Sequence, residues 1–267
     1  MSGYEDVEVH PNLVERRHDD GVVVLRIDRE DALGALSRSI LTALSDYLVG
    51  ISADDAVRVL VLTGTGKGFI AGADIGEYHG VSQEGFDDYQ RLGRQVFSQV
   101  EGLPQYTVAA VNGFALGGGF EIALCCDAVL ASERAKFGLP EVRLGLLPGG
   151  GGTQRLARAL GTRFTTQLVV TGELVRADEL YRRGLLASVH PAEDVLGAAL
   201  ALAHAVAANA PLPVRAAKKL IADGTELPLE DALTLEQDVL SQLFRSADAK
   251  EGIDAFVAKR EPDFRGT

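Results

Sequence analysis

The first half of the chain alternates between two patterns of apolar residues. Residues 22–27 (VVVLRI) and 57–63 (VRVLVLT) are short runs rich in β-branched side chains, which are typical of buried strands. Between them, residues 37–50 carry apolar side chains at helical spacing. The alternation then continues with a Gly-rich loop at 64–76, helices at about 84–101 and from Gly119, and strands at 107–111 and 128–131.

Beyond Thr153 the pattern becomes almost entirely helical. Helical spacing covers residues 153–160, 162–170, 177–182, 192–209, 212–222 and 229–256. The sequence therefore predicts an α/β core followed by a helical layer. We expect residues 1–195 to form the core domain and residues 196–267 to form a C-terminal helical region.

Composition narrows the classes of partner. With 267 residues, 46% of them hydrophobic, the chain can bury a substantial core. The formal charge of −12 repels nucleic-acid phosphates and anionic lipids, so neither nucleic acid nor membrane is an expected partner. The two cysteines, Cys125 and Cys126, are neighbours that cannot readily pair, and the N-terminus lacks an apolar signal core. We expect small core cysteines and a cytoplasmic location.

Glu121 is the first candidate for chemistry. It is the only charged side chain between Glu101 and Asp127, in an apolar and Gly-rich segment. A buried carboxylate has to be paired, protonated or set against a cavity, because an unpaired buried charge costs several kcal/mol. Residues 117–119 are glycines that leave backbone N–H groups open to an anion at the start of a helix. A tight packing turn with a surface Glu is the equally open alternative.

A second carboxylate lies in the segment KFGLPEVRLGLLPGGGGTQRL, residues 136–156. Pro140 fixes the backbone ahead of Glu141. Pro148 opens a four-glycine run, and Thr153 is the predicted N-cap of the next helix. This pattern predicts a positioned carboxylate and a second set of exposed amides. No Gly-Lys-Ser/Thr follows the glycines, which argues against nucleotide hydrolysis.

Other polar and aromatic residues receive structural interpretations. The five histidines show no close metal-ligand spacing, and no GxSxG motif occurs, so we expect neither a metal site nor a serine nucleophile. Tyr78 and His79 are interpreted as part of a surface loop, with a pocket wall as the alternative. Phe256 is interpreted as a helical core residue. The histidines are His10, His18, His79, His190 and His204.

Taken together, the motifs resemble the crotonase, or enoyl-CoA hydratase/isomerase, family. They are REDALGAL at 29–36, AGADI at 71–75, NGFALGGGFE at 112–121, GLPEVRLGLLPGGGGTQRL at 138–156 and EGIDAFVAKREPDF at 251–264. Their order and spacing match the family over nearly the whole chain. The resemblance implies a spiral of ββα units with a C-terminal helical region that helps form trimers, usually paired into hexamers.

The resemblance also implies roles for residues of the site. Glu121 and Glu141 match the two glutamates of hydratases, which hold a water that adds hydroxide to C3 of a 2-enoyl-CoA and a proton to C2. The amides of Ala73 and Gly118 match the oxyanion hole, and Gly149 matches a backbone contact near the water. Family isomerases often keep only the carboxylate corresponding to Glu141, so two glutamates favour hydration.

Further residues match positions that contact CoA: Ala32, Leu33, Ala71, Asp74, Ile75 and Gly76. Gly76 stands where the family often has lysine, and Gly34 stands where the early motif often has asparagine. The contact made by that lysine would then be missing or come from another cation, and the Gly34 loop would hold adenine less tightly. The candidate cations are Arg29, Lys67 and Lys259.

The implied protein is thus an enoyl-CoA hydratase of fatty acid metabolism, a homotrimer or homohexamer. Its substrate is an acyl-CoA thioester, CoA is part of that substrate, and no further cofactor or metal is expected. The alternatives on the same fold are an enoyl-CoA isomerase and an acyl-CoA hydrolase. A non-catalytic RNA-binding relative is a further alternative, against which the acidity of the chain argues.

Overall fold

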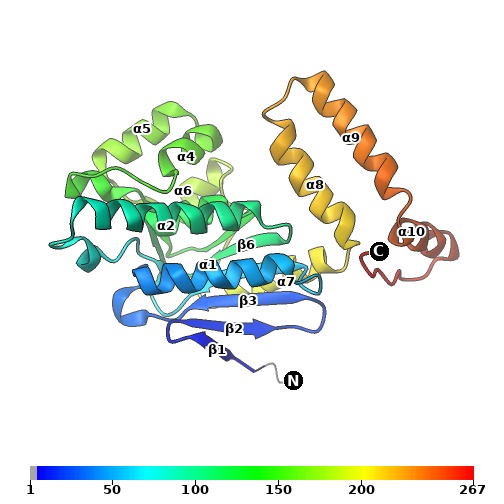
Figure 1. Ribbon diagram of the computed structural model, residues 1–267, viewed down its shortest axis with the longest axis horizontal. Coiled ribbons are helices and arrows are strands. Elements are labelled where there is room, and N and C mark those ends of the chain that lie inside the picture. The colour runs from blue at the N-terminus through cyan, green and yellow to red at the C-terminus, as the bar shows by residue number, and fades with distance from the viewer. Residues whose placement is uncertain (1–4) are drawn as a thin grey trace.

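A computed structural model describes residues 5–267, and a seven-stranded sheet forms the centre of this range. β1 and β2 form an antiparallel hairpin at one edge, and every pairing from β3 onward is parallel (Figure 1). The strands, in spatial order, are β1 (Val7–His10), β2 (Leu13–Arg17), β3 (Val22–Ile27), β4 (Val59–Gly64), β6 (Tyr106–Val111), β8 (Ala128–Ser132) and β11 (Ser188–His190).

A second, smaller sheet runs alongside the first. Its strands, in spatial order, are β10 (Val175–Arg176), β9 (Lys136–Gly138), β7 (Phe114–Leu116) and β5 (Gly68–Ile70). β5, β7 and β9 each follow a long strand of the main sheet, so the chain repeats a long strand, a short strand and a helix. This repeat confirms the predicted fold class with its ββα units.

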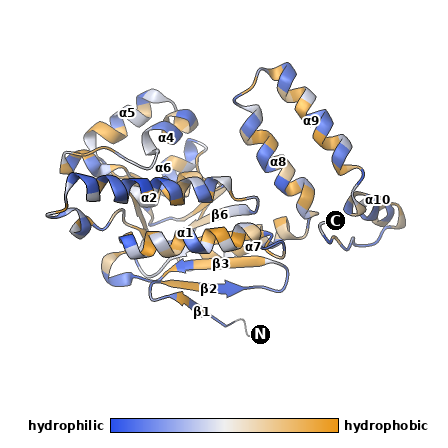
Figure 2. Cartoon of the chain, viewed as in Figure 1, coloured by the Kyte–Doolittle hydropathy of each residue, from blue (hydrophilic) through white to orange (hydrophobic). Residues whose placement is uncertain are grey.

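Helices cover both faces of the main sheet. α1 (Arg38–Ala53) and α2 (Gln83–Gly102) lie over one face, whereas α7 (Val195–Ala207) lies on the other. On β3, Val23 and Leu25 join the cluster under α1 and α2, whereas Val22 and Val24 join the cluster with α7. Because both faces are buried, residues 22–25 of the strand are a continuous apolar run, coloured hydrophobic in Figure 2.

The remaining helices of the body are short, and two of them begin within glycine runs. They are α3 (Gly118–Cys125), α4 (Gly152–Leu160), α5 (Thr162–Thr171) and α6 (Ala177–Arg182), with short 3₁₀ helices η1 (Glu30–Ala32), η2 (Ile75–Tyr78) and η3 (Pro140–Leu144). Cys125 is buried in the core and Cys126 is partly buried, and neither forms a disulfide.

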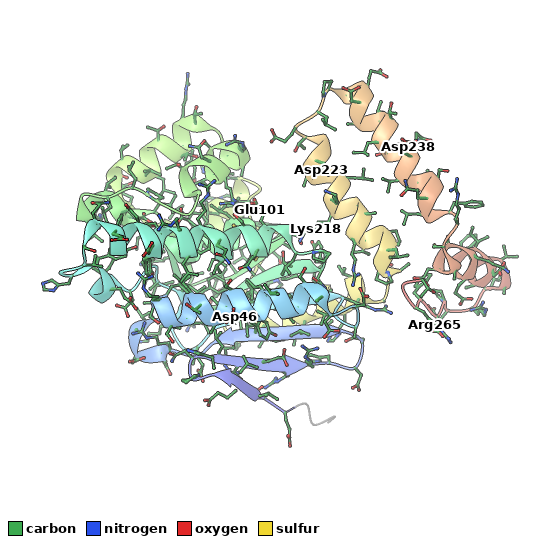
Figure 3. The ribbon with its side chains drawn as sticks, in the orientation of Figure 1. Asp46, Glu101, Lys218, Asp223, Asp238 and Arg265 are labelled. Atoms are coloured by element: carbon green, nitrogen blue, oxygen red, sulfur yellow. The ribbon has the colours of Figure 1, made fainter. Side chains whose placement is uncertain are left out.

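The C-terminal helices α8 (Pro211–Gly224), α9 (Leu229–Leu243) and α10 (Ala247–Ala258) extend to one side of the body (Figure 1). Lys218 of α8 forms an ion pair with Asp127 at 2.7 Å and donates to the carbonyl of Gln105 at 3.0 Å, which ties the helix to the body (Figure 3). The division at residue 195 stays a prediction; α7, which begins there, packs against the main sheet.

Two predictions for the C-terminal region are wrong. Residues 229–256 do not form one helix, because the side chain of Ser246 accepts a hydrogen bond from the backbone N–H of Ala249 and caps a new helix there. Phe256 is no core residue, since it is 86% exposed. Hydrophobic and hydrophilic residues alternate along α8 and α9 in Figure 2.

Within residues 5–267, no single helix is long and apolar enough to cross a membrane. α7 and α8 together meet the requirement for length and composition, but the chain bends by 107° between them.

Candidate active site

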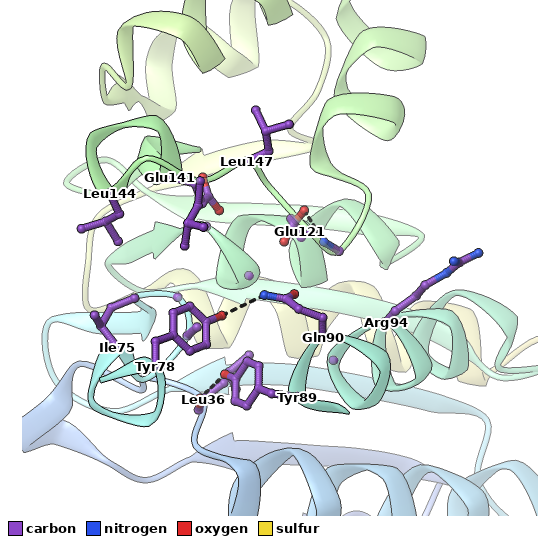
Figure 4. A pocket seen from close by; sticks show the side chains of 18 of the residues that line it. Leu36, Ile75, Tyr78, Tyr89, Gln90, Arg94, Glu121, Glu141, Leu144 and Leu147 are labelled. Carbon is purple, nitrogen blue, oxygen red and sulfur yellow. Dashed lines mark hydrogen bonds between the residues drawn. The ribbon is translucent and has the colours of Figure 1, made fainter. Parts of the chain in front are cut away.

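A cavity of about 150 Å³ opens between α2, the AGADI loop, the start of α3 and the loop after η3 (Figure 4). Seven of the residues singled out in the sequence line it: Ala71, Ala73, Ile75, Gly118, Glu121, Glu141 and Gly149. The other four lie in neighbouring segments outside its wall: Ala32, Leu33, Asp74 and Gly76. The fold thus brings together both glutamates and both candidate amide donors.

Glu121 lies in the first turn of α3 and is 2% exposed. Its Oε1 accepts hydrogen bonds from the backbone N–H of Gly150 at 2.9 Å and of Gly152 at 2.7 Å. Burial raises the pKa of Glu121, and these two bonds to the carboxylate oppose that rise. Oε1 of Glu121 therefore accepts both hydrogen bonds, and Oε2 is the oxygen that remains available to a ligand.

The second glycine loop consequently has a different role from the predicted one. Its amides at Gly150 and Gly152 point at Glu121, so they are not open to a ligand. Gly151 lies between them at φ +102°, a conformation that glycine adopts readily and that lets both flanking amides face one oxygen. Gly151, and not Thr153, is the N-cap of α4, so the predicted Thr153 cap is wrong.

Glu141 lies in the first turn of η3 and has a different environment. Its Oε2 is buried without a hydrogen-bond partner in residues 5–267. Burial, with a further contribution from the negative charge of Glu121, raises the pKa of Glu141 to about 7. One pocket therefore holds a carboxylate fixed by amides and a carboxyl group that carries a proton for much of the time near neutral pH.

The backbone N–H groups of Ala73 and Gly118 are free donors at the pocket wall. Gly118 is the first residue of α3, where an N–H has no partner within the helix. Around Ala73, Leu36 donates to the carbonyl of Gly72 and accepts from Asp74, so that the Ala73 N–H faces away from Leu36. Neither N–H has an acceptor in the described part of the chain.

Tyr78 forms part of one wall of the pocket, which is the alternative that the sequence left open for it. Tyr78 is partly buried, and its ring packs edge-on against Phe86 and Tyr89, each at 5.2 Å between centroids. Its hydroxyl accepts a hydrogen bond from Gln90 Nε2 at 3.2 Å and lies in the pocket. The surface-loop interpretation of Tyr78 is therefore wrong. His79 does not line the cavity.

The rest of this wall comes from one face of α2. Gln90, Gly93, Arg94 and Phe97 stand at positions i, i+3, i+4 and i+7 of the helix and all line the cavity. That spacing places them along one helix face. It is the signal in the sequence that would have pointed to this wall.

The segment expected to contact CoA is stabilised by its own ion pair. Arg29 pairs with Asp74 at 2.8 Å and donates to the carbonyl of Ala35. Arg29 is thus held by these partners, which weakens it as a substitute for the missing lysine. Gly34 has φ +76°, and a Cβ there would lie 2.6 Å from the carbonyl oxygen of Phe69. The loop is thus closely packed at Gly34.

Within residues 5–267 no group of three or more His, Cys, Asp or Glu side chains is arranged to hold a metal ion. The polar groups of the pocket include the two glutamates, the Tyr78 hydroxyl, Gln90, Arg94 and backbone amides, whereas the Tyr89 hydroxyl donates to the carbonyl of Leu36 at 2.6 Å. These groups can transfer protons and bind an oxyanion.

Comparisons with known proteins agree with this geometry. The enoyl-CoA hydratase/isomerase family model matches residues 17–267. The crotonyl-CoA hydratase of Syntrophomonas wolfei is 39% identical, covering 92% of this chain and 95% of that protein. The 2,3-dehydroadipyl-CoA hydratase of Escherichia coli is 38% identical, and the match covers 92% of this chain and 95% of that protein. The crystal structure of an enoyl-CoA hydratase from Bacillus anthracis superposes with a TM-score of 0.93 at 36% identity, covering 96% of this chain and 100% of that one. The chain therefore belongs to the enoyl-CoA hydratase/isomerase, or crotonase, family.

Proposed function

We propose that the protein is an enoyl-CoA hydratase that adds water across the 2,3 double bond of a 2-enoyl-CoA thioester. The observation that carries the proposal is the pair Glu121 and Glu141, two carboxyl groups in contrasting environments that line one cavity. Hydration needs one group that takes a proton from water and one that gives a proton to carbon. Two free backbone N–H groups beside the pair complete the requirement for an oxyanion site.

In the proposed mechanism the thioester carbonyl oxygen accepts hydrogen bonds from the N–H groups of Ala73 and Gly118. Glu121 Oε2 takes a proton from water, and the oxygen of that water bonds to C3. The π electrons shift toward the carbonyl, where the two N–H groups stabilise the charge that develops. Glu141 then donates its proton to C2, which forms the 3-hydroxyacyl-CoA. Transfer of one proton from Glu121 to Glu141 restores the enzyme.

The proposed roles predict how much activity is lost when one of these groups is removed. Losing one oxyanion donor typically lowers kcat about 100- to 1000-fold, and losing a general acid or base lowers it about 100- to 10,000-fold. The reaction adds the elements of water and involves no redox step. In the proposed mechanism CoA is therefore only a part of the substrate. We propose no further cofactor.

The test is product analysis with crotonyl-CoA and with a 3-enoyl-CoA. A hydratase yields a 3-hydroxyacyl-CoA from crotonyl-CoA, an isomerase converts the 3-enoyl-CoA to the 2-enoyl form, and a hydrolase releases free CoA. Glu121→Gln and Glu141→Gln should each reduce hydration by at least about 100-fold. Failure of the protein to hydrate any 2-enoyl-CoA would refute the proposal, and salt-sensitive RNA binding would then be tested.

We also propose a homotrimer or a hexamer made of two trimers. The support is a set of exposed apolar side chains on the C-terminal helices, which a monomer would leave in water: Ile221, Leu229, Leu240, Phe244, Phe256 and Val257. Light scattering should give a trimeric or hexameric mass, and Phe256→Asp should lower it, whereas Val49→Asp on α1 should not. A monomeric parent would contradict the assembly. A cytoplasmic location stays a prediction.

A further inference from the structure

Arg94 lines the cavity but has no protein partner. No ion pair or hydrogen bond joins its side chain to another group in residues 5–267. Arg91, one turn earlier on α2, pairs with Asp88 instead. The residues three and four positions from Arg94 are Gln90, Arg91, Phe97 and Ser98, none of which is a carboxylate. Arg94 is therefore an exposed cation at the edge of the pocket, without an internal counter-charge.

Arg94 lies on the side of the pocket toward which the acyl chain of the substrate would extend. In Figure 4, Ile75 and Leu144 lie at one end of the cavity and Glu121 and Gln90 lie farther along, and the side chain of Arg94 extends outward from the opposite end. In the proposed function, CoA enters along the AGADI loop and C3 sits at the glutamates. The acyl chain beyond C3 then runs past Gln90 toward Arg94.

A guanidinium group at the Arg94 end of the cavity is not suited to binding a plain alkyl chain. A methyl terminus gains nothing from a guanidinium, whereas a carboxylate matches its planar pair of N–H donors. With a net charge of −12 the protein disfavours an anionic acyl group elsewhere, so a local cation is needed to accept one. Gln90, one turn before Arg94, adds a neutral polar group that Tyr78 holds in place.

We propose that Arg94 binds a terminal carboxylate of the acyl chain, so that ω-carboxyl 2-enoyl-CoA thioesters are preferred over methyl-terminated ones. This inference rests on the proposed hydratase function and names the substrate class of the same site. Arg94 is thus a specificity-determining residue that takes no part in the proton transfers.

The experiment compares kcat/KM for 2,3-dehydroadipyl-CoA and 2-hexenoyl-CoA, which have acyl chains of equal length. The parent protein should favour the carboxylate substrate. Arg94→Gln should lower the ratio of the two kcat/KM values by about 10- to 100-fold, the range for hydrogen bonds to a charged group. Arg91→Gln is the matched control, because Arg91, like Arg94, is an exposed arginine on the same helix but lies outside the pocket, and it should leave the ratio unchanged.

The outcomes separate the inference from the function on which it rests. A parent that hydrates 2-hexenoyl-CoA at least as well as 2,3-dehydroadipyl-CoA overturns the inference and leaves the hydratase proposal standing. An equal loss on both substrates in Arg94→Gln, with an unchanged melting temperature, assigns Arg94 to the CoA moiety and also overturns it. A parent that hydrates neither substrate, nor crotonyl-CoA, rejects the hydratase function itself.

Discussion

Replacing Glu141 by glutamine should remove activity and yet make the protein more stable at high pH relative to the parent. Burial raises the pKa of Glu141 to about 7 from an ordinary value of 4.5. Between these two pH values the folded chain keeps a proton that the unfolded chain has lost. The free energy of unfolding of the parent must therefore fall as the pH rises through this window. Glutamine has no proton to lose and carries no such dependence.

The magnitude follows from the same pair of values. One pKa unit corresponds to about 1.4 kcal/mol, so the interval from 4.5 to about 7 corresponds to about 3 kcal/mol at most. Glu141 is only partly buried, and solvent screening reduces the effect. We expect the stability difference between Glu141→Gln and the parent to increase by about 1 to 2 kcal/mol from pH 5 to pH 8.

Urea unfolding of both proteins at pH 5 and pH 8 measures this difference. Protomer concentration has to be held constant, because assembly adds to apparent stability, and the m-values should agree between the two proteins. Titrating groups that do not interact with Glu141 cancel in the comparison, whereas Glu121 is coupled to Glu141 and contributes to the difference. Glu193→Gln, an exposed glutamate ahead of α7, serves as the control. A difference that stays constant from pH 5 to pH 8, or that shrinks, would show that burial does not raise the Glu141 pKa.

Three further predictions concern the same pocket. Glu121→Gln should lower kcat for crotonyl-CoA by about 100- to 10,000-fold with little change in KM, since the amide oxygen still accepts from Gly150 and Gly152 but takes no proton; a loss confined to KM would contradict this. The kcat of the parent should fall as the pH rises above about 7, where Glu141 loses the proton that it donates, and a flat profile up to pH 9 would speak against that role. Gly150→Ala should destabilise the protein by about 1 to 3 kcal/mol, because its Cβ would clash with the Phe97 ring and lie 2.8 Å from Glu121 Oε2. Gly197→Ala, which meets no atom within 4 Å, should instead be neutral or stabilising in a thermal melt.

The long elements were predictable because their patterns are local. The predicted strand at 22–27 coincides with β3, and the predicted helix at 84–101 differs from α2 by one residue at each end. The three-residue strands β5 and β7 escaped prediction, because three residues cannot display a period and their pairing partners lie far away in sequence. β1 was missed since its side chains are largely exposed, as expected for an edge strand.

The site was predictable in part. A lone glutamate in an apolar segment singled out Glu121, and its burial bears out the reasoning that such a group needs partners. Nothing local indicates that Glu141 lines the same cavity, because that depends on how η3 lies against α3; only the family resemblance implied it. Tyr78 follows a loop of small residues, a pattern that is typical of an exposed loop. It is partly buried because its ring packs against Phe86 and Tyr89 on α2, which the local sequence does not indicate.

The stretch from Pro140 to Gly152 holds one glutamate at its beginning and supplies both amides that fix the other glutamate near its end. The two carboxyl groups are therefore set by a single short piece of backbone of fixed length. In protein engineering, residues 140–152 should therefore be transferred between related proteins as one unbroken segment, together with the helix that bears Glu121. Inserting or deleting one residue between Val142 and Gly149 would displace Glu141 relative to Glu121, whereas side-chain changes at Leu144 or Leu147 would alter the pocket wall and leave the two glutamates in place.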